Sequence, residues 1–166
     1  MSFAESILPE FDHEMANTRR ALERVPEEKL DWRPHVKSNT LGWVASHLAE
    51  IPGLTENVLT EPSFDVRPPD GEDVRTLVLD THREILDTFD RNVAAARQVI
   101  AAFPDARMAE PWSLLEGGTP IITLPRSAVL RQFVLSHIIH HRAVLCVYLR
   151  LNDVPVPGMF GPSGDE

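Results

Sequence analysis

The chain has 166 residues, of which 43% are hydrophobic. It can therefore bury a core as one domain over residues 1–166, and its composition is unlike that of disordered or membrane-spanning chains. The net charge of −9, from 16 basic and 25 acidic residues, disfavours binding to the phosphates of a nucleic acid. The single cysteine, Cys146, cannot form an internal disulfide, and the first residues show no signal peptide, so we expect a cytoplasmic protein with no membrane partner.

Two helices are predicted in the first third of the chain. Apolar residues recur at spacings of three, four or seven over Ser2–Val25, and Ser2 can form a capping box with Glu5. After a charged loop, Asn39 or Thr40 can cap a second helix. Pro52 lies inside that helix and predicts a kink.

Two more helices follow a polar connector that contains prolines. Thr81 and Glu84 can form a capping box at the start of a helix that reaches about Phe103. Residues 104–125 contain paired glycines and a short apolar run, which predicts an extended strap or small hairpin. The last helix is predicted over Arg126–Leu151. The pattern predicts an all-α fold: an antiparallel four-helix bundle with irregular connections and this strap before the last helix.

Three of the seven histidines fall where a core residue is expected. His137 and His141 are four residues apart, so their side chains project from one face of the last helix. His47 lies on the apolar face of the second helix. Facing helices lie about 8–10 Å apart, so three imidazoles can converge on one ion at metal–nitrogen distances of about 2.0–2.1 Å. The pattern predicts one divalent metal ion, but histidines alone do not identify it, so zinc, nickel, iron and manganese all stay open at this point.

Other interpretations of the histidines stay open. A histidine on an apolar face is more often a hydrogen-bonded core residue than a ligand, so a core without an ion is one alternative. His140 lies about 60° from His137 around the helix and could replace His141 as a ligand. Glu50, three residues after His47, could support a ligand histidine or be a surface carboxylate. The remaining histidines are expected in solvent: His13, His35 and His82.

Three protein ligands leave a coordination position open for water or substrate, as in catalytic zinc sites. Water bound there is acidified towards a pKa of about 7 and becomes a usable nucleophile. The segment His137–His141 lacks the glutamate of the zinc-protease motifs, and the chain has no nucleophile elbow and no phosphate-binding glycine loop. No general base can be assigned, so the sequence leaves the catalytic residues unknown.

The last helix carries a second apolar stripe, which Arg142 interrupts. A helix that is apolar nearly all round is buried on both sides, and a second copy of the chain is the simplest cover. We therefore expect a homodimer formed through the last helix. The stripe consists of Leu135, Ile138, Ile139, Cys146 and Leu149.

Several segments together resemble the DinB-like family of four-helix bundles, a group of bacterial metal-binding proteins. They are Phe11–Arg20, Ala45–Glu50, Leu124–Arg126, Ser136–Arg142, Tyr148–Pro157 and Gly161–Glu166. The resemblance implies a histidine triad that binds nickel, zinc or a similar ion, and commonly a homodimer. The triad matches His47, His137 and His141. Where relatives often continue with Arg-Gly-Gln, this chain has Arg142-Ala143-Val144, which puts in doubt any activity that depends on the missing polar side chain.

Two classes of function are compatible with these observations. The first is a metal-dependent enzyme, either a thiol-dependent transferase or isomerase that uses a small-molecule thiol, or a hydrolase. The second is a metal-binding or stress-response bundle without catalytic activity, in which the ion locks the helices. A fourth protein ligand would favour the structural role, and an exchangeable water would favour catalysis.

Overall fold

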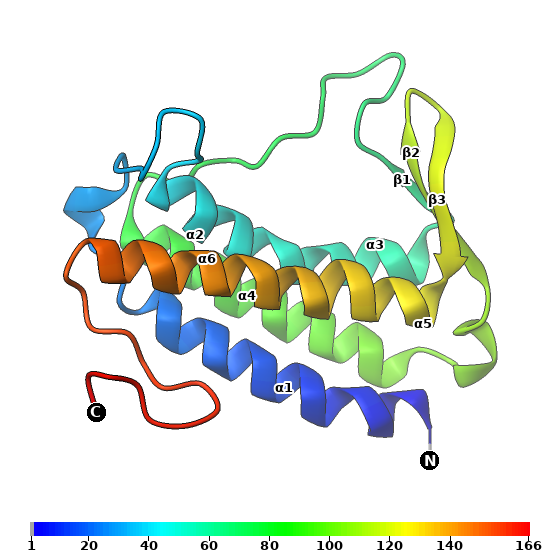
Figure 1. Ribbon diagram of the computed structural model, residues 1–166. Helices are drawn as coiled ribbons and strands as arrows, with labels where there is room; N and C mark the ends of the chain where they lie inside the picture. The colour runs from blue at the N-terminus through cyan, green and yellow to red at the C-terminus, as the bar shows by residue number, and fades with distance from the viewer. Residues whose placement is uncertain (1) are drawn as a thin grey trace.

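The computed structural model describes residues 2–166, which form mostly helices with a small sheet at one end (Figure 1). The α-helices are α1 (Phe3–Leu22), α2 (Leu41–Glu50), α3 (Leu54–Thr60), α4 (His82–Ala102), α5 (Arg126–Val129) and α6 (His137–Leu151). Short 3-10 helices are η1 (Glu27–Lys29), η2 (Ile51–Gly53) and η3 (Asp105–Arg107), and η4 (Leu130–Ser136) is a π-helical segment. None of the described helices combines the length and hydrophobicity needed to cross a membrane.

The predicted helix starts are confirmed. Ser2 caps α1 and Thr81 caps α4, each in a complete capping box with the glutamate three residues later. Thr40, and not Asn39, caps α2, because its side chain accepts a hydrogen bond from the Trp43 amide. The interruption expected at Pro52 is the 3-10 turn η2, which separates α2 from α3.

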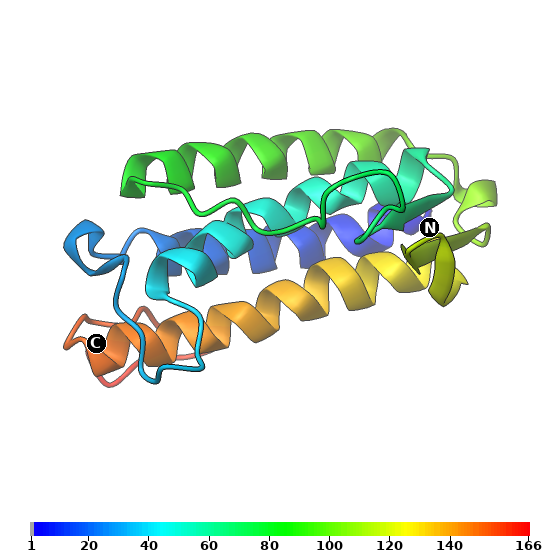
Figure 2. The ribbon, with the colours of Figure 1, turned by 90° about the horizontal axis from the view of Figure 1, so that it is seen from above.

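The helices pack side by side as four rods, with α2–α3 forming one rod and α5–α6 another (Figures 1 and 2). Contacts between side chains give their directions. Asp12 and Asp90 pair with Arg97 and Arg19 respectively, so α1 and α4 run antiparallel. His47 meets His137, and Tyr148 donates to the Asn39 carbonyl, so α2 and α6 also run antiparallel.

The other two neighbouring pairs run parallel, which differs from the antiparallel bundle predicted from the sequence. In Figure 1 both α2–α3 and α4 run away from the end where α1 finishes, whereas α1 and α6 run towards it. The reason is the long connector after α3, which returns along the bundle so that α4 starts at the same end as α2. Such a crossover connection replaces the tight turn that an antiparallel neighbour would need.

A three-stranded sheet, order β1-β2-β3, corrects the all-α prediction. Strands β2 (Pro111–Glu116) and β3 (Thr119–Pro125) form the small hairpin predicted over residues 104–125. Strand β1 (Ser63–Asp65) pairs parallel with β2 and lies in the connector that the sequence marks only as polar. The Asp65 carboxylate accepts hydrogen bonds from the amides of Gly117 and Gly118, both with positive φ, and so ties β1 to the hairpin turn.

The last rod starts at the hairpin and contains the π-helical segment η4. Arg126, at the first position of α5, donates hydrogen bonds to the carbonyls of Val58 and Glu61 at the end of α3. After η4 the chain continues as α6, which ends at Asn152 as predicted. The wide turn therefore lies directly before His137. Such turns are frequent at functional sites.

The second apolar stripe of α6 is largely covered within the chain itself. Leu135, Ile138 and Leu149 are buried in its core. Arg142, which interrupts the stripe, is also buried and pairs at 2.6 Å with Glu14 of α1. The exposed apolar side chains of α6 are Ile139, Val147 and Leu151. Three of the five stripe residues are therefore covered within the chain, Cys146 is half-buried and Ile139 is exposed, and the homodimer stays a prediction.

Candidate metal centre

The structure brings His47, His137 and His141 together between α2 and α6. Nε2 of His137 lies 3.2 Å from Nε2 of His47 and 3.0 Å from Nε2 of His141. One ring nitrogen from each of the three residues lies within 4.8 Å of the other two. The face shared by His137 and His141 in α6, and the apolar face of α2, therefore meet as the spacing predicts.

A hydrogen bond outside the cluster holds the His47 ring. Nδ1 of His47 lies 2.8 Å from the Thr76 hydroxyl. When Nδ1 donates this bond, Nε2 presents its lone pair to the cluster. Burial raises the pKa of the Glu50 carboxyl, and its hydrogen bonds to the Leu77 amide and to the Thr76 side chain oppose that shift. Glu50 is therefore linked to His47 through Thr76 and not by direct contact.

His137 is oriented in the same way. Its ring donates a hydrogen bond to the backbone of Phe133, one turn earlier in the helix. Nε2 of His137 then faces Nε2 of His47 at 3.2 Å. Nδ1 of His141 is buried and has no hydrogen-bond partner among the described residues.

This arrangement fits a metal ion. Neutral imidazole nitrogens that converge on one point are the ligands that zinc, nickel, copper and iron prefer. Tetrahedral coordination at metal–nitrogen distances of about 2.0–2.1 Å would space the ligand nitrogens about 3.3 Å apart, close to the observed separations. Outer partners such as Thr76 and Phe133 are what ligand histidines in metal sites usually have.

Burial keeps the three imidazoles neutral, which is the form that binds a metal. Burial, reinforced by His137, lowers the pKa of His47 to about 4. Burial, followed by the three neighbouring histidines, lowers the pKa of His141 to about 4. Burial also lowers the pKa of His137, against the opposing effect of its bond to Phe133. At pH 7 the site is therefore ready for a cation without first losing protons.

These shifts predict how the stability of the metal-free protein depends on pH. The unfolded chain binds protons on its histidines near pH 6.5, whereas the folded chain does so on His47 and His141 only near pH 4. The unfolded state holds more protons between these values, so the free energy of unfolding should fall as the pH drops from 6.5 to 4. Thermal unfolding scans over this range measure the slope. His47→Gln should flatten it, and curves of equal slope would contradict the assignment.

The other histidines lie outside the cluster. His13 and His35 are exposed, as predicted. His140 is exposed too, with its ring centroid 4.8 Å from that of His141, and it is not one of the three converging residues. His82 differs from its prediction: it is half-buried, and its Nε2 lies 2.8 Å from the Leu22 carbonyl at the end of α1.

The loop of residues 66–80 lies over the centre, and the sequence does not mark it as part of the site. Three of its residues contact one turn and a half of α2. Thr76 bonds His47, the Leu77 amide donates to Glu50, and the Leu79 amide donates to the Ser46 hydroxyl. On the other side of the site, the Trp43 ring stacks on His47 with centroids 4.7 Å apart. No periodic pattern marks these loop residues, because two of them contribute only a backbone amide and the third contributes one hydroxyl.

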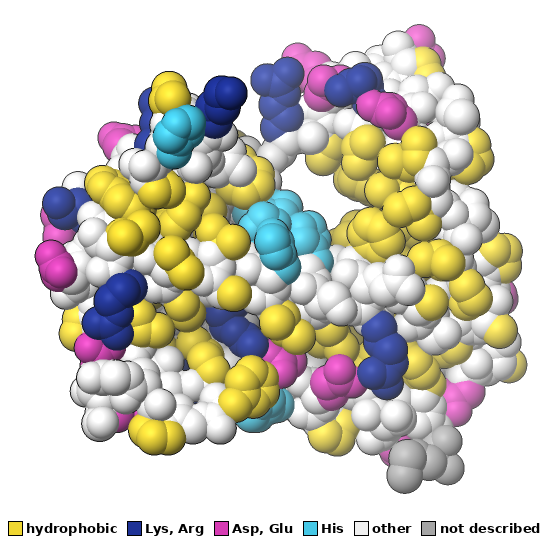
Figure 3. Space-filling view, viewed as in Figure 1, with side chains coloured by type: hydrophobic (Ala, Val, Ile, Leu, Met, Phe, Trp, Pro, Cys, Tyr) yellow, Lys and Arg dark blue, Asp and Glu magenta, His cyan; other side chains and the backbone are white. Residues whose placement is uncertain are grey.

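A cavity of about 470 Å³ opens beside His47 and His137 and under the 66–80 loop. Figure 3 shows the histidine side chains at the edge of this hollow, with hydrophobic side chains on the opposite wall. The cavity is lined by residues of α2, η2, α3, β1 and the loop, with Asn92 from α4 and His137 from α6. It has the size of an ordinary small-molecule site and gives the histidines access to a ligand.

Comparison with known proteins agrees with this architecture. Residues 10–145 match the sequence profile of the DinB superfamily. The chain belongs to the DinB superfamily. The resemblance found in the sequence is thereby confirmed for most of the chain length. No curated protein matches this DinB-superfamily member.

Two crystal structures share the fold of this DinB-superfamily protein. A DinB-like protein from Bacillus cereus ATCC 10987 superposes with a TM-score of 0.72 at 22% identity, over 94% of this chain and 97% of the other. A DinB-like protein from Bacillus subtilis gives a TM-score of 0.65 at 14% identity, over 90% and 95% of the two chains. At these identities the likeness concerns the fold.

Proposed function

We propose that this protein is a metal-dependent enzyme that holds one divalent ion, zinc or nickel, with His47, His137 and His141. The observation that carries the proposal is the convergence of three imidazoles, with Nε2 of His137 3.2 Å from that of His47 and 3.0 Å from that of His141. Neutral imidazoles that converge in this way are ligands for zinc, nickel, copper or iron. When bound, the ion would act as a Lewis acid and acidify a coordinated water or thiol.

The cavity beside the histidines favours catalysis over a structural role. Structural zinc sites are closed by four protein ligands, whereas only three candidate ligands converge here among residues 2–166. The open side of the site faces a cavity large enough for a small molecule. An ion that only locked the helices would need neither feature.

Residues of this chain would prepare the site for the ion. Thr76 holds the His47 ring through Nδ1. Trp43 stacks on the same ring and restricts its rotation. Burial raises the pKa of the Cys146 thiol, so this cysteine is a poor nucleophile and a thiol reactant would be a small molecule. A thiol-dependent transferase or isomerase and a hydrolase both fit these conditions.

The test is whether the bound ion keeps a position open for an exogenous ligand. Cobalt(II) replaces zinc in such sites and reports its coordination by visible absorption. We expect the spectrum of the cobalt-loaded protein to change on addition of azide or of a small thiol. A spectrum that neither ligand alters would indicate a closed site and support the second candidate, a structural ion in a bundle without catalytic activity.

We also propose a homodimer in the cytoplasm. Ile139, Val147 and Leu151 are spaced by four or eight residues and form an exposed apolar face on α6. A single cysteine without a disulfide suits a reducing compartment. Light scattering at micromolar concentration should give twice the chain mass, and Val147→Glu should reduce it to one chain. A wild-type monomer would contradict the dimer.

A further inference from the structure

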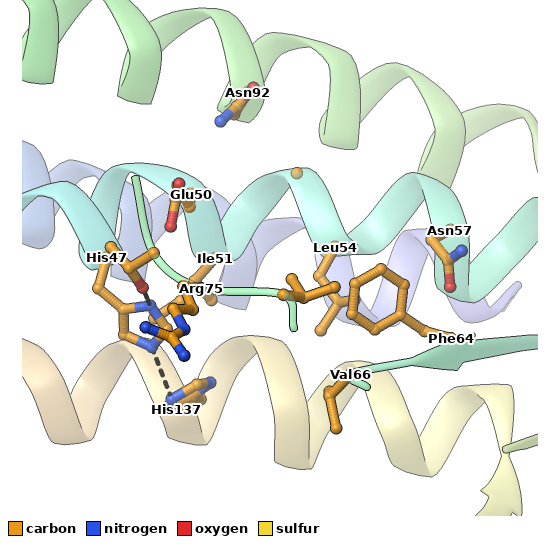
Figure 4. A pocket seen from close by; sticks show the side chains of 13 residues that line it. His47, Glu50, Ile51, Leu54, Asn57, Phe64, Val66, Arg75, Asn92 and His137 are labelled. Atoms are coloured by element: carbon orange, nitrogen blue, oxygen red, sulfur yellow. Dashed lines mark hydrogen bonds between the residues drawn. The ribbon is translucent and has the colours of Figure 1, made fainter. Parts of the chain in front are cut away.

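We propose that the cavity beside the three histidines binds a small amphipathic monocarboxylate. Its carboxylate would lie between the histidine site and Arg75, and its apolar body would lie against the far wall of the cavity. The inference rests on the proposed function, because the bound ion is one of the two positive groups at the polar end. Figure 4 shows the side chains from which the argument is made.

The cavity separates polar from apolar groups along its length. His47, His137 and Arg75 lie at one end, and Leu54, Phe64 and Val66 lie at the other (Figure 4). The apolar wall comes from three elements: α3 contributes Leu54, β1 contributes Phe64, and the 66–80 loop contributes Val66 and Val74. The backbone of Val74 bonds that of Val66, which holds both valines in the wall. A ligand that fills this space has one polar end and an apolar body.

The amides that line the cavity are partly engaged with the protein. Asn57 accepts from the Trp112 indole and donates to the Ser63 carbonyl. Asn92 donates to the Ala49 carbonyl. Most of the remaining wall consists of apolar side chains, so burying several polar groups of a ligand body there would be unfavourable. An aliphatic or aromatic body loses no hydrogen bonds on this wall.

Arg75 gives the polar end its charge. Arg75 lines the same cavity as His47 and His137, and its side chain is mostly exposed. Its one ion pair is long, 3.8 Å to Asp73, and Asp73 lies closer to Arg67 at 3.2 Å. The acidic residue in the lining, Glu50, points its carboxylate at the Leu77 amide. Arg75 is therefore available to a ligand anion.

A carboxylate is the anion that suits this end best. The planar guanidinium matches a carboxylate with two parallel hydrogen bonds, and a metal ion accepts carboxylate oxygen. One arginine on a chain of net charge −9 suits a single negative charge better than a phosphate with two, because the overall field repels multiply charged anions. The shape, the apolar wall and the exposed Arg75 guanidinium therefore point to one class of ligand.

Calorimetric titration of the zinc-loaded full chain tests this proposal with four probes: hexanoate, butanoate, hexan-1-ol and hexylammonium. Hexanoate should bind several-fold more tightly than butanoate, because each buried methylene adds up to about fourfold. The alcohol and the ammonium should bind at least tenfold more weakly, on the order expected for a charge-assisted pair. Equal affinity for hexanoate and either of these two would overturn the proposal.

Variants separate the two ends of the cavity. Arg75→Gln should lower the affinity for hexanoate about five- to tenfold while leaving the zinc content and the weak binding of hexan-1-ol unchanged. Phe64→Ala should reduce the difference between hexanoate and butanoate. Arg83→Gln, an exposed arginine of α4 outside the cavity lining, is the matched control and should change neither. If Arg75→Gln behaves like Arg83→Gln, the carboxylate is held by the ion alone and the proposal fails.

The metal-free protein distinguishes this proposal from the proposed function. Zinc content alone decides whether the histidines hold an ion. In a preparation without zinc, the dependence on chain length and on Arg75 should persist at lower affinity. If zinc is bound but neither dependence appears, the carboxylate site is wrong and the metal site stands.

Discussion

Replacing His137 with alanine should abolish metal binding. Nε2 of His137 is the central nitrogen of the cluster, within hydrogen-bond distance of Nε2 of both His47 and His141. Two remaining imidazoles on different helices make a weak site, since three protein ligands are the usual minimum for zinc. Elemental mass spectrometry of the purified protein should find about one equivalent of ion in the wild type and almost none in the variant.

Two further variants make this measurement specific. His140→Ala removes an exposed histidine from the same helix and should keep the full metal content, because His140 does not belong to the converging group. Thr76→Val removes the hydroxyl that orients His47 and should weaken metal affinity about 10- to 100-fold, the range found for such outer partners. If metal is lost from His140→Ala and kept in His141→Ala, the third ligand is His140 and not His141. An absence of metal in all forms, even after reconstitution, would contradict the site.

The Arg142→Met variant should lose about 3–5 kcal/mol of the free energy of unfolding. The guanidinium of Arg142 pairs with the Glu14 carboxylate at 2.6 Å, and their side chains are only 4% and 8% exposed. It also donates to the Glu14 carbonyl and the Thr18 hydroxyl. Methionine fills similar space but leaves the carboxylate buried without its counter-charge. Urea unfolding followed by circular dichroism measures the loss.

A double variant identifies the cause. Arg142→Met combined with Glu14→Leu removes both charges, and most of the lost stability should return, because well-packed apolar pairs can replace buried ion pairs at little cost. If the double variant is as unstable as Arg142→Met, the loss comes from packing and not from an unpaired carboxylate. A loss below about 1 kcal/mol in the single variant would show that solvent reaches Glu14.

The parts of the fold that depend on local sequence could be predicted. The capping boxes at Ser2 and Thr81 and the break at Pro52 follow from hydrogen bonds within a few residues, and all three are found. The convergence of His47 with His137 and His141 could also be predicted, because helical periodicity places them on inward faces. The position of His82 near a loop predicts that it lies in solvent. The contact that contradicts this prediction, with the Leu22 carbonyl, joins residues 60 positions apart and leaves no local signal.

The features that depend on the path of the connector could not be predicted. Strand β1 has three residues and forms only because β2 lies beside it, so its own sequence carries no alternation to recognise. The parallel course of α2 and α4 follows from the same connector. Thr76 and Arg75 reach the site only through that path. Arg142 carried a usable signal, because one arginine in an apolar stripe indicates a buried acidic partner, but the stripe alone does not name Glu14.

The π-helical segment η4 makes the register of the last rod sensitive to its length. Arg126 fixes the start of the rod to α3, and Arg142 fixes the middle of α6 to α1. A wide turn accommodates one residue more than regular helix does, and each residue of a regular helix turns the chain by about 100°. Deleting a single residue from Leu130–Ser136 would therefore rotate His137 and His141 away from His47 unless Arg126 or Arg142 left its partners. A relative without the wide turn should accordingly show a one-residue gap at this point when its sequence is aligned with this one.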